Sequence, residues 1–475
     1  MHKSSETFDQ NAREALADEH LRGALKRATE RFSEKRKEAV LERPDWEEMR
    51  EEARCIKEET LTQLDRYLEE FVHHAEAAGA EVHWARDGHE ACRIVCGIAD
   101  VVQAGTVVKS KSMTTEEIDL NQALARGDHP TVETDLGEWI IQLAEEPPSH
   151  IIAPAIHKTK EDVGALFAEK LSIEETHDIE ELTRIARRFL RKSFAEADLG
   201  VSGVNFAIAE TGTILILENE GNARLTTSLP KVHVAMMGIE KILPRFGDLE
   251  VFLRLLPRSG TGQRLTSYQS LITGTTEGEG PEEVHIVILD NGRSAMLADR
   301  VTRQSLACIR CGACLNHCPV YREIGGHAYG SVYPGPIGSV ITPQLAGAEK
   351  ASALPFASSL CGACREVCPV KIDLPELLLE LRSRIVARKG LPSSPDAKSP
   401  LPRRTLERLG FKLWAFAMGG PLRYRLFMGA ARLVSRLRFL ERLVPPLSTW
   451  KRGRDLPRPA ATSFRAAWRR RRSSR

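Results

Sequence analysis

The chain has 475 residues, of which 42% are hydrophobic and 28% charged. This length is too great for one ordinary hydrophobic core, so we expect two or three domains, and the composition excludes a disordered or fibrous protein. The formal charge of +2 hides an uneven distribution, because residues 401–475 contain 20 Lys and Arg against three acidic residues. The sequence therefore predicts a mildly acidic body with a strongly basic C-terminal region.

The cysteines indicate the cellular compartment. The N-terminus lacks the apolar stretch of a secretory signal, and nowhere do 18 apolar residues follow one another, so no membrane-spanning helix is predicted. Seven of the ten cysteines lie in two tight groups. Grouped cysteines without a signal peptide favour a reducing compartment and metal binding over disulfides. We expect a cytoplasmic protein.

Four regions follow one another along the chain. Residues 1–59 are rich in Glu, Arg, Lys and Ala and predict a helical N-terminal segment. Residues 60–300 open with an amphipathic helix that ends at Gly79, and then alternate between apolar strand-like runs and helical runs. The expected strands include residues 81–85, 106–110, 149–156, 204–209, 213–219, 231–237 and 282–290. This alternation predicts an α/β domain around a sheet that is at least partly parallel.

The sequence pattern changes after Arg300. Residues 301–390 predict short helices around the two cysteine groups, followed by a helix that begins near Pro375 and ends at Gly390. Residues 391–475 begin with a Pro- and Ser-rich linker and continue as basic, amphipathic helix candidates. We therefore expect a small helical cysteine domain and a separate C-terminal segment.

The cysteine groups carry the strongest chemical signal. The first reads C-x2-C-x2-C-x3-C-P, a spacing that wraps three thiolates around one cubane and directs the fourth towards a second cluster. The second group has the same spacing, with Ser358 where its first cysteine would stand. Iron–sulfur clusters are thus predicted, and electron transfer through them is the expected activity.

Crossed ligation of the kind found in two-cluster ferredoxins assigns the ligands. The first cluster receives Cys308, Cys311, Cys314 and Cys368. The second receives Cys318, Cys361 and Cys364. With three thiolates, the second cluster is either a [4Fe–4S] with a non-cysteine ligand or a [3Fe–4S]. Zinc is the alternative metal, but seven thiolates with two Cys-Pro steps fit closed tetrahedral sites poorly.

Other residues near cysteines have two readings each. Arg310 and Arg365 either raise the cluster potentials or simply face solvent. Cys92 and Cys96 share a helical run without further ligands nearby, which favours buried core cysteines over a redox or metal pair. Cys55 receives the same reading.

Three stretches of the α/β region are candidates for functional sites as well as for structural roles. Residues 109–112, Lys-Ser-Lys-Ser, end a strand before a helix, and read either as an anion cradle or as a well-capped helix with solvated lysines. Glu210 lies between two apolar runs, in a hairpin turn or at a ligand site. His157 and Lys158 follow the expected strand 149–156, where a lone His is more often structural.

Residues from about 60 to 390 resemble the lactate-utilisation protein B family, in which a LUD domain precedes a ferredoxin-type module. The resemblance is carried, in the family's order, by VVKSKSMTTEEIDLN, VETDLGEWIIQL, HIIAPAIHKTKEDV, ADLGVSGVNFAIAETGTI, CIRCGACLNHCPVYREIGGHAYGSVYPGPIGSV and SSLCGACREVCPVKIDLPELL. The basic region after residue 400 resembles the family's C-terminal segment, but less closely than residues 60–390 resemble the rest of the family.

The resemblance implies a fold, cofactors and partners. It implies a LUD domain of the isomerase/CoA-transferase type, followed by an all-α helical ferredoxin domain like that of succinate dehydrogenase-like subunits. It implies two [4Fe–4S] clusters held by seven cysteines, so that Ser358 is the family's normal state. The protein would be an iron–sulfur subunit of a system that oxidises L-lactate to pyruvate. Its partners would be a second cysteine-rich iron–sulfur subunit and a further LUD-domain protein.

Two other functions stay open at this point. The chain could be a LUD-domain enzyme of the transferase or isomerase kind with structural or regulatory clusters, in which Glu210 is the candidate nucleophile. It could also be an electron-transfer subunit for another hydroxy acid. For the basic C-terminal segment we expect docking to a partner or peripheral contact with an anionic membrane, and no nucleic-acid binding, since no nucleic-acid fold is recognisable.

Overall fold

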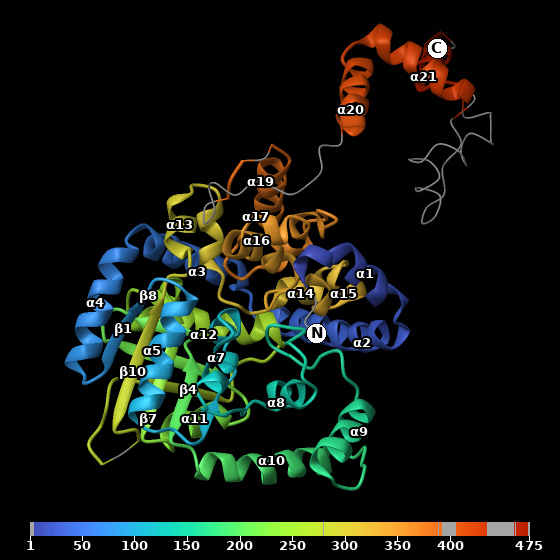
Figure 1. The fold of residues 1–475 in the computed structure, drawn as a ribbon. Helices are drawn as coiled ribbons and strands as arrows, with labels where there is room; N and C mark the ends of the chain where they lie inside the picture. The colour runs from blue at the N-terminus through green and yellow to red at the C-terminus, as the bar shows by residue number, and fades with distance from the viewer. Residues whose placement is uncertain are drawn as a thin grey trace. The chain divides into compact units, whose positions relative to one another are not determined.

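The computed structural model describes residues 4–278, 280–387, 389–391, 405–434, 460 and 462–473. The chain divides into two compact units, Met1–Leu401 and Pro402–Arg475, which are described separately (Figure 1). The boundaries expected after residues 59 and 300 lie inside the larger unit, and they stay predictions.

Four helices open the larger unit: α1 (Phe8–Ala17), α2 (Glu19–Leu41), α3 (Trp46–Thr62) and α4 (Leu64–Ala77). The carboxylate of Asp18 caps the start of α2 by accepting a hydrogen bond from the backbone N–H of Leu21 at 2.9 Å. The helices α1 and α2 lie beside the cysteine-bearing region far along the chain (Figure 1). Leu25 and Trp46 belong to the same apolar core as Cys314.

A six-stranded parallel sheet forms the centre of the α/β region, with the strand order β1-β10-β7-β4-β2-β3. Its strands are β1 (Glu81–Ala85), β2 (Val107–Lys109), β3 (Thr131–Glu133), β4 (Leu199–Gly203), β7 (Val232–Gly238) and β10 (Glu283–Leu289). Every residue of β7 is buried, as expected for a central strand covered on both faces. All the paired strands run parallel, which confirms the α/β prediction.

Helices cover both faces of this sheet. On one face α5 (Gly88–Val101) and α7 (Leu120–Arg126) pack against β4 and β7, and on the other face α4 packs with a second sheet. Further helices are α6 (Met113–Glu117), α8 (Leu136–Leu143), α9 (Lys160–Leu171), α10 (Ile179–Ala195) and α11 (Asn222–Ser228). Because all six strands run parallel, their carboxyl ends lie at one edge of the sheet, where side chains from several loops can meet.

The second sheet is smaller and mixed, with the order β8-β5-β6-β9. Its strands are β5 (Phe206–Ile208), β6 (Thr213–Glu218), β8 (Ile242–Leu243) and β9 (Tyr268–Ile272). The helix α12 (Leu249–Gly260) lies between β8 and β9 in the chain, and α13 (Arg293–Ala298) follows β10. The rings of Phe206 in β5 and Phe252 in α12 are in tilted contact, with centroids 5.0 Å apart, and this contact joins the sheet to the core that contains the cysteines.

The cysteine region consists of short helices. They are the 3-10 helix η4 (Thr302–Ala307), α14 (Ala313–His317), α15 (Tyr321–Ile324), η5 (His327–Tyr329), α16 (Gly335–Ala346), α17 (Ala348–Ala351), η6 (Leu354–Phe356), α18 (Ala363–Val367) and α19 (Leu374–Ala387). No strand occurs among residues 301–387, all of which the structure describes. The helix expected to begin near Pro375 is α19.

The strand predicted at residues 149–156 is wrong. The segment is a loop of bends and turns. Pro154 cannot donate a ladder hydrogen bond, and the backbone is held by the cysteine region instead. The hydroxyl of Tyr321 donates to the carbonyl of Ser149 at 2.7 Å, and His150 bonds the side chain of Asn316 at 3.1 Å. The apolar run 149–156 has no partner strand, and it packs against the cysteine region instead.

The smaller unit contains α20 (Thr405–Met418), α21 (Pro421–Val434) and α24 (Phe464–Ser473) among its described residues. The basic helices expected in this segment match α20 and α21, and the rest of that prediction, residues 435–444, lies outside the described residues. Large apolar side chains on α20 and α21 are exposed, including Phe411, Trp414 and Leu426. In the described parts of the whole chain, no helix is both long and apolar enough to cross a membrane.

Candidate metal centre

The two cysteine groups fold into two loops of the same design. In the first loop Arg310 has φ +59° and Gly312 has φ +74° before α14 begins. In the second loop Leu360 has φ +55° and Gly362 has φ +89° before α18 begins. The same left-handed pair precedes the same short helix in both loops, so the two loops share one backbone design.

Ser358 occupies the place of a cysteine in this design. The backbone N–H of Arg310 points to the sulfur of Cys308 at 3.4 Å, and the N–H of Leu360 points to the hydroxyl oxygen of Ser358 at 3.1 Å. The serine is therefore the counterpart of Cys308 in position and in hydrogen bonding, as the sequence spacing predicts. Arg382 fixes the turn by donating to the carbonyl of Ser358 at 2.8 Å.

Four of the seven thiols line one small apolar cavity. They are Cys308, Cys311, Cys314 and Cys368, the set predicted for the first cluster. The remaining walls include Ile151, Ile337 and Val370, so the thiols face apolar groups rather than water. Cys368 comes from the second loop, which places the predicted crossing of the two loops at this cavity.

The other three thiols form a second group. Cys318 and Cys364 are buried and Cys361 is exposed. Burial, together with charge on Cys318 and Cys361, raises the pKa of Cys364 to about 12. Thiols that share an electrostatic field and resist deprotonation are stable as thiolates only beside a cation, which is the environment that iron supplies.

Backbone donors complete the fit to iron–sulfur clusters. The N–H of Ile372 donates to the sulfur of Cys368 at 3.3 Å, as that of Arg310 does to Cys308. Burial raises the pKa of Cys368 to about 11. Hydrogen bonds of this kind stabilise charged sulfur and tune cluster potentials. The residues present thus fit a thiolate-bound cluster.

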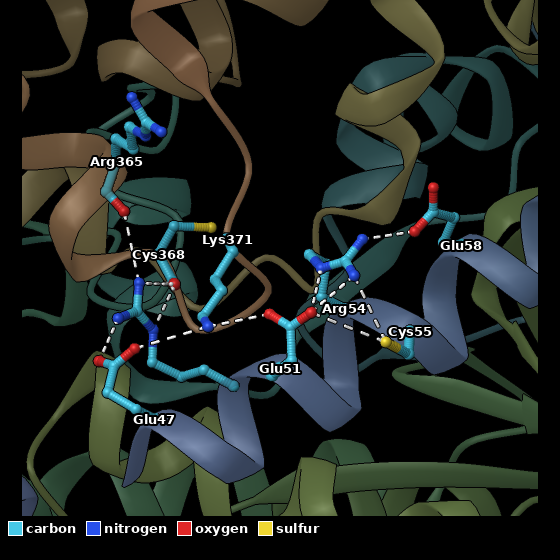
Figure 2. Close-up of polar contacts among 9 residues, drawn as sticks. Glu47, Glu51, Arg54, Cys55, Glu58, Arg365, Cys368 and Lys371 are labelled. Atoms are coloured by element: carbon cyan, nitrogen blue, oxygen red, sulfur yellow. Dashed lines mark hydrogen bonds and ion pairs between the residues drawn. The ribbon is translucent and has the colours of Figure 1, made fainter.

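An N-terminal helix holds the second loop in place (Figure 2). Arg50 of α3 donates to the carbonyl of Cys368 at 2.8 and 3.0 Å and pairs with Glu47. Lys371 reaches back to Glu51 at 2.9 Å. The sequence contains no local signal for these contacts, because α3 lies more than 300 residues before Cys368 in the chain.

A buried ion network joins the first loop to the α/β region. Arg293 of α13 bonds Glu117 at 2.7 Å and pairs with Glu240 at 2.8 Å, and Arg310 pairs with Glu240 at 3.4 Å. The ring of Tyr333 lies 4.8 Å from the Arg310 guanidinium, and its hydroxyl donates to Glu117 at 2.7 Å. Sequence reasoning missed this network, since its five members come from five separate stretches of the chain.

Charge explains why the network tolerates burial. Burial alone would raise the pKa of Glu240, but Arg293 and Arg310 outweigh it and hold the pKa at about 2. Lys57 of α3 adds a donor, with its ammonium 2.6 Å from the carbonyl of Glu240. Removing one member of such a network leaves an uncompensated buried charge, which costs about 3–5 kcal/mol.

The two arginines beside the cysteines differ. The side chain of Arg310 is 10% exposed and belongs to the buried network, so the solvent-facing reading does not hold for it. The side chain of Arg365 is 65% exposed and pairs with Asp373 at 3.0 Å. Only Arg310 is placed to act on a cluster through a medium of low dielectric constant.

The segment 109–112 begins a well-capped helix, as one reading predicts, but Lys109 is not solvated, and the anion cradle stays a prediction. Lys109 is fully buried between Glu116 and Glu133, each 2.8 Å away, and these carboxylates outweigh burial and raise its pKa. Ser112 caps α6 by accepting from the N–H of Thr115. Ser110 and Lys111, together with Ser112, line a cavity beside the first cysteine loop.

Glu210 lies in the turn of the β5–β6 hairpin, exposed. Its carboxylate accepts a hydrogen bond from the N–H of Phe246 at 2.8 Å. It does not line the cavity that Lys111 lines. His157 and Lys158 both pair with Glu146, at 2.6 and 2.8 Å. These contacts fit the structural readings of all three residues.

The cysteines outside the loops are of two kinds. Cys92 and Cys96 are half-buried on α5, and burial raises the pKa of Cys92 to about 11, in line with the expectation of inert packing. The prediction that Cys55 is buried is wrong, because it lies exposed on α3 beside Arg54 (Figure 2). The outer face of α3 is charged, and the apolar face of the helix does not include Cys55.

Comparison with known families covers this whole arrangement. A LUD domain model matches residues 68–289, a 4Fe-4S dicluster domain model matches residues 304–372, and a model of the lactate utilisation protein B C-terminal region matches residues 380–473. The chain is 44% identical over 468 residues to lactate utilization protein B of Bacillus pumilus, covering 97% of this chain and 96% of the relative. It is 43% identical over 471 residues to lactate utilization protein B of Bacillus subtilis, covering 97% and 95%.

The chain belongs to the lactate utilization protein B family. The family assignment confirms the resemblance read from the sequence and supports a role in lactate utilisation and the binding of iron–sulfur clusters. A crystal structure of a DUF162 family protein from Deinococcus radiodurans matches 48% of this chain and 98% of its own, at 13% identity and a TM-score of 0.26. The members of the lactate utilization protein B family named above match the chain across the α/β region, both cysteine loops and the basic C-terminal helices.

Proposed function

We propose that this protein is an electron-transfer subunit of a system that oxidises L-lactate to pyruvate. The observation that carries the proposal is the pair of matching cysteine loops, with four thiols around one cavity and three in a second group. Bound clusters would supply one-electron transfer. The chain's own part is to bury the thiols, direct backbone N–H groups at sulfur, and hold the first loop against the α/β region through Glu240 and Arg310.

The proposal includes two clusters. Cys308, Cys311, Cys314 and Cys368 would hold one [4Fe–4S], and Cys318, Cys361 and Cys364 the other. Ser358 is the candidate for the remaining position of the second cluster, since its oxygen stands where the first loop has Cys308. Without an oxygen ligand there, the second cluster would be a [3Fe–4S].

Anaerobic purification, iron quantification and EPR test the cluster count. We expect about eight iron atoms per chain and two distinguishable signals on reduction with dithionite. About seven iron atoms would indicate one three-iron cluster. Zinc in place of iron would refute the proposal.

The lactate part of the proposal rests on the relatives, whose names concern lactate utilisation. Deletion of the gene should abolish growth on L-lactate in a strain that has no redundant lactate dehydrogenase. Normal growth of that strain on L-lactate would contradict it, and a defect on another hydroxy acid alone would redirect the substrate.

The remaining parts of the proposal concern fold type and assembly. We propose that the LUD domain is of the isomerase/CoA-transferase type and that the cysteine region is a helical ferredoxin domain. The described residues 301–387 contain helices and loops without a strand, which supports the second point. Partners would be a second cysteine-rich iron–sulfur subunit and a further LUD-domain protein, in the cytoplasm or peripherally on the inner membrane face. Co-purification of tagged protein from lactate-grown cells tests the partners.

A further inference from the structure

A cavity of roughly 250 Å³ lies between the α/β region and the first cysteine loop. Its walls come from the end of β2, the β4–β5 connection, the segment after β6, the end of α12 and the first cysteine loop. It therefore opens at the carboxyl ends of β2 and β4, the edge at which open α/β sheets bind ligands. The loop residues that line it include Arg310 and Cys311.

Three cationic side chains line this cavity: Lys111, Lys241 and Arg310. Within the described part of the chain, the side-chain ammonium groups of Lys111 and Lys241 form no hydrogen bond and no ion pair. One terminal nitrogen of Arg310, Nη1, is buried without a partner. Burial lowers the pKa of Lys241 to about 8, and the nearby charge of Glu240 offsets this effect only in part.

An unpaired hydroxyl accompanies the cations. Ser110 is 2% exposed, lines the cavity, and its Oγ has no hydrogen-bond partner. A buried polar group of this kind costs about 1–3 kcal/mol unless something pairs with it. An acceptor atom inside the cavity would satisfy this hydroxyl and the cations together.

The acidic residues of the same cavity are already engaged. Asp135 accepts from the N–H of Glu138, and Glu220 accepts from the N–H of Leu136. Glu218 accepts from two backbone N–H groups, at 2.9 and 3.0 Å. The unsatisfied groups are thus donors and cations, which favours an anionic ligand over a metal ion.

The mixed lining selects among anions. The acidic side chains disfavour a highly charged ligand such as a phosphate ester, although burial and the charge of Asp135 raise the pKa of Glu220 to about 7. Each carboxylate has lone pairs beyond those that its backbone donors occupy, and these can accept a hydrogen bond from a ligand hydroxyl. A small monocarboxylate with an adjacent hydroxyl or carbonyl oxygen offers a planar acceptor for Arg310 and the lysines and a polar group for the acidic side.

We infer that this cavity is a binding site for a small 2-hydroxy- or 2-oxo-carboxylate, held by Lys111, Lys241 and Arg310 against the first cysteine loop. The inference rests on the proposed function in its choice of ligand class, and it assigns to the LUD domain the binding of that ligand. Lys111 and Lys241 are positioned to bind the carboxylate, with Ser110 as a further donor.

Equilibrium binding tests the inference on the full-length, anaerobically purified protein. L-Lactate and pyruvate are the probes. Their binding is measured by calorimetry in the absence of any electron acceptor. We expect saturable binding, weakened about tenfold or more in Lys111→Gln and in Lys241→Gln, since each substitution removes a charged hydrogen bond worth about 1.5–3 kcal/mol. Lys192→Gln is the matched control, because this lysine of α10 is 76% exposed and does not line the cavity.

A second variant and a second ligand keep the outcome decisive. Lys111→Arg should restore much of the affinity lost in Lys111→Gln, which loss of folding would not allow. Absence of saturable binding, equal binding by all variants, or tighter binding of inorganic phosphate than of both carboxylates would overturn the inference. Iron content and EPR signals on the same samples separate the two claims: intact clusters without carboxylate binding refute the site alone, and binding without reducible clusters refutes the electron-transfer function alone.

Discussion

Ser358 and Cys308 occupy the same place in two matching loops, yet only one of them offers sulfur. Both side-chain atoms receive a backbone N–H from the residue two positions later. An alkoxide oxygen is a harder ligand than a thiolate, so a cluster with this serine as its fourth ligand should differ electronically from its neighbour. In the proposed pair of clusters, one side-chain atom would therefore account for the difference.

Ser358→Cys should change the EPR signal and reduction potential of one cluster only. The new thiolate would complete four-cysteine ligation, while the cavity of Cys308 stays as it is. Ser358→Ala should shift the same signal in its own way, since it removes the oxygen. Redox titration followed by EPR measures both. Ser359→Ala is the control, as the neighbouring exposed serine. Spectra unaffected by either change at Ser358 would show that its side chain is not part of the site.

His233 makes the fold sensitive to acid. It is fully buried in β7, with Ser202 2.8 Å from its Nε2, and burial lowers its pKa from 6.5 to about 3. The unfolded chain therefore binds one more proton than the folded chain between those values. Stability is complete above about pH 6.5 and falls below it by up to about 1.4 kcal/mol per pH unit.

His233→Gln should remove that component. Thermal unfolding midpoints at a fixed scan rate, from neutral pH down to about pH 5, should fall less steeply for the variant than for the native protein. His73→Gln, at an exposed histidine of α4, serves as the control and should follow the native curve. Parallel curves for His233→Gln and the native protein would contradict the assignment.

At the scale of elements, α3 ties the N-terminal helices to the second cysteine loop. Arg50→Met should speed iron loss to a chelator under anaerobic conditions, because the buried carbonyl of Cys368 loses both of its arginine donors. An unpaired buried carbonyl costs about 1–3 kcal/mol. Release of iron can be followed by the absorbance of the chelate.

Arg54→Met is the matched control on the same helix. Its guanidinium bonds Glu51 and Glu58 and makes no contact with the cysteine loop (Figure 2). Surface pairs of this kind contribute about 0–1 kcal/mol, so iron loss should stay close to the native rate. Equal acceleration by both variants would show that general loosening of α3, rather than the Cys368 contact, is responsible.

Elements with a strong local signal could be predicted from the sequence. The apolar run 232–238 and the helix near Pro375 lie where the sequence pattern places them, and the equal cysteine spacing agrees with the matching loops. The run 149–156 looked like a strand because apolar composition does not reveal whether a neighbouring strand exists. The network around Glu240 and the hydrogen bonds from Arg50 to the carbonyl of Cys368 join segments that are distant in the chain. A single sequence contains no periodic signal for such contacts.

At the scale of the whole molecule, the basic C-terminal unit should bind anionic surfaces. Its described helices expose Phe411, Trp414 and Leu426 among arginines, a combination suited to a lipid interface. Sedimentation with vesicles that contain anionic lipid should retain the full-length protein at low salt and release it at high salt.

Neutral vesicles are the control for that experiment, and Trp414→Glu should weaken binding to the anionic ones. Sedimentation that depends on neither lipid charge nor salt would contradict lipid binding. Retention only after addition of a partner subunit would instead assign the unit to protein docking.

The crossing of the two cysteine loops also has a consequence for assembly. Cys368 of the second loop lines the cavity of the first, so neither loop alone supplies all the thiols that meet there. Filling that cavity therefore requires both loops to be folded, and filling it also orders the second loop for its own metal. Reconstitution of the apo-protein with limiting iron and sulfide should yield a mixture of empty and doubly loaded molecules, because the half-loaded state gains only part of the energy of closing both loops.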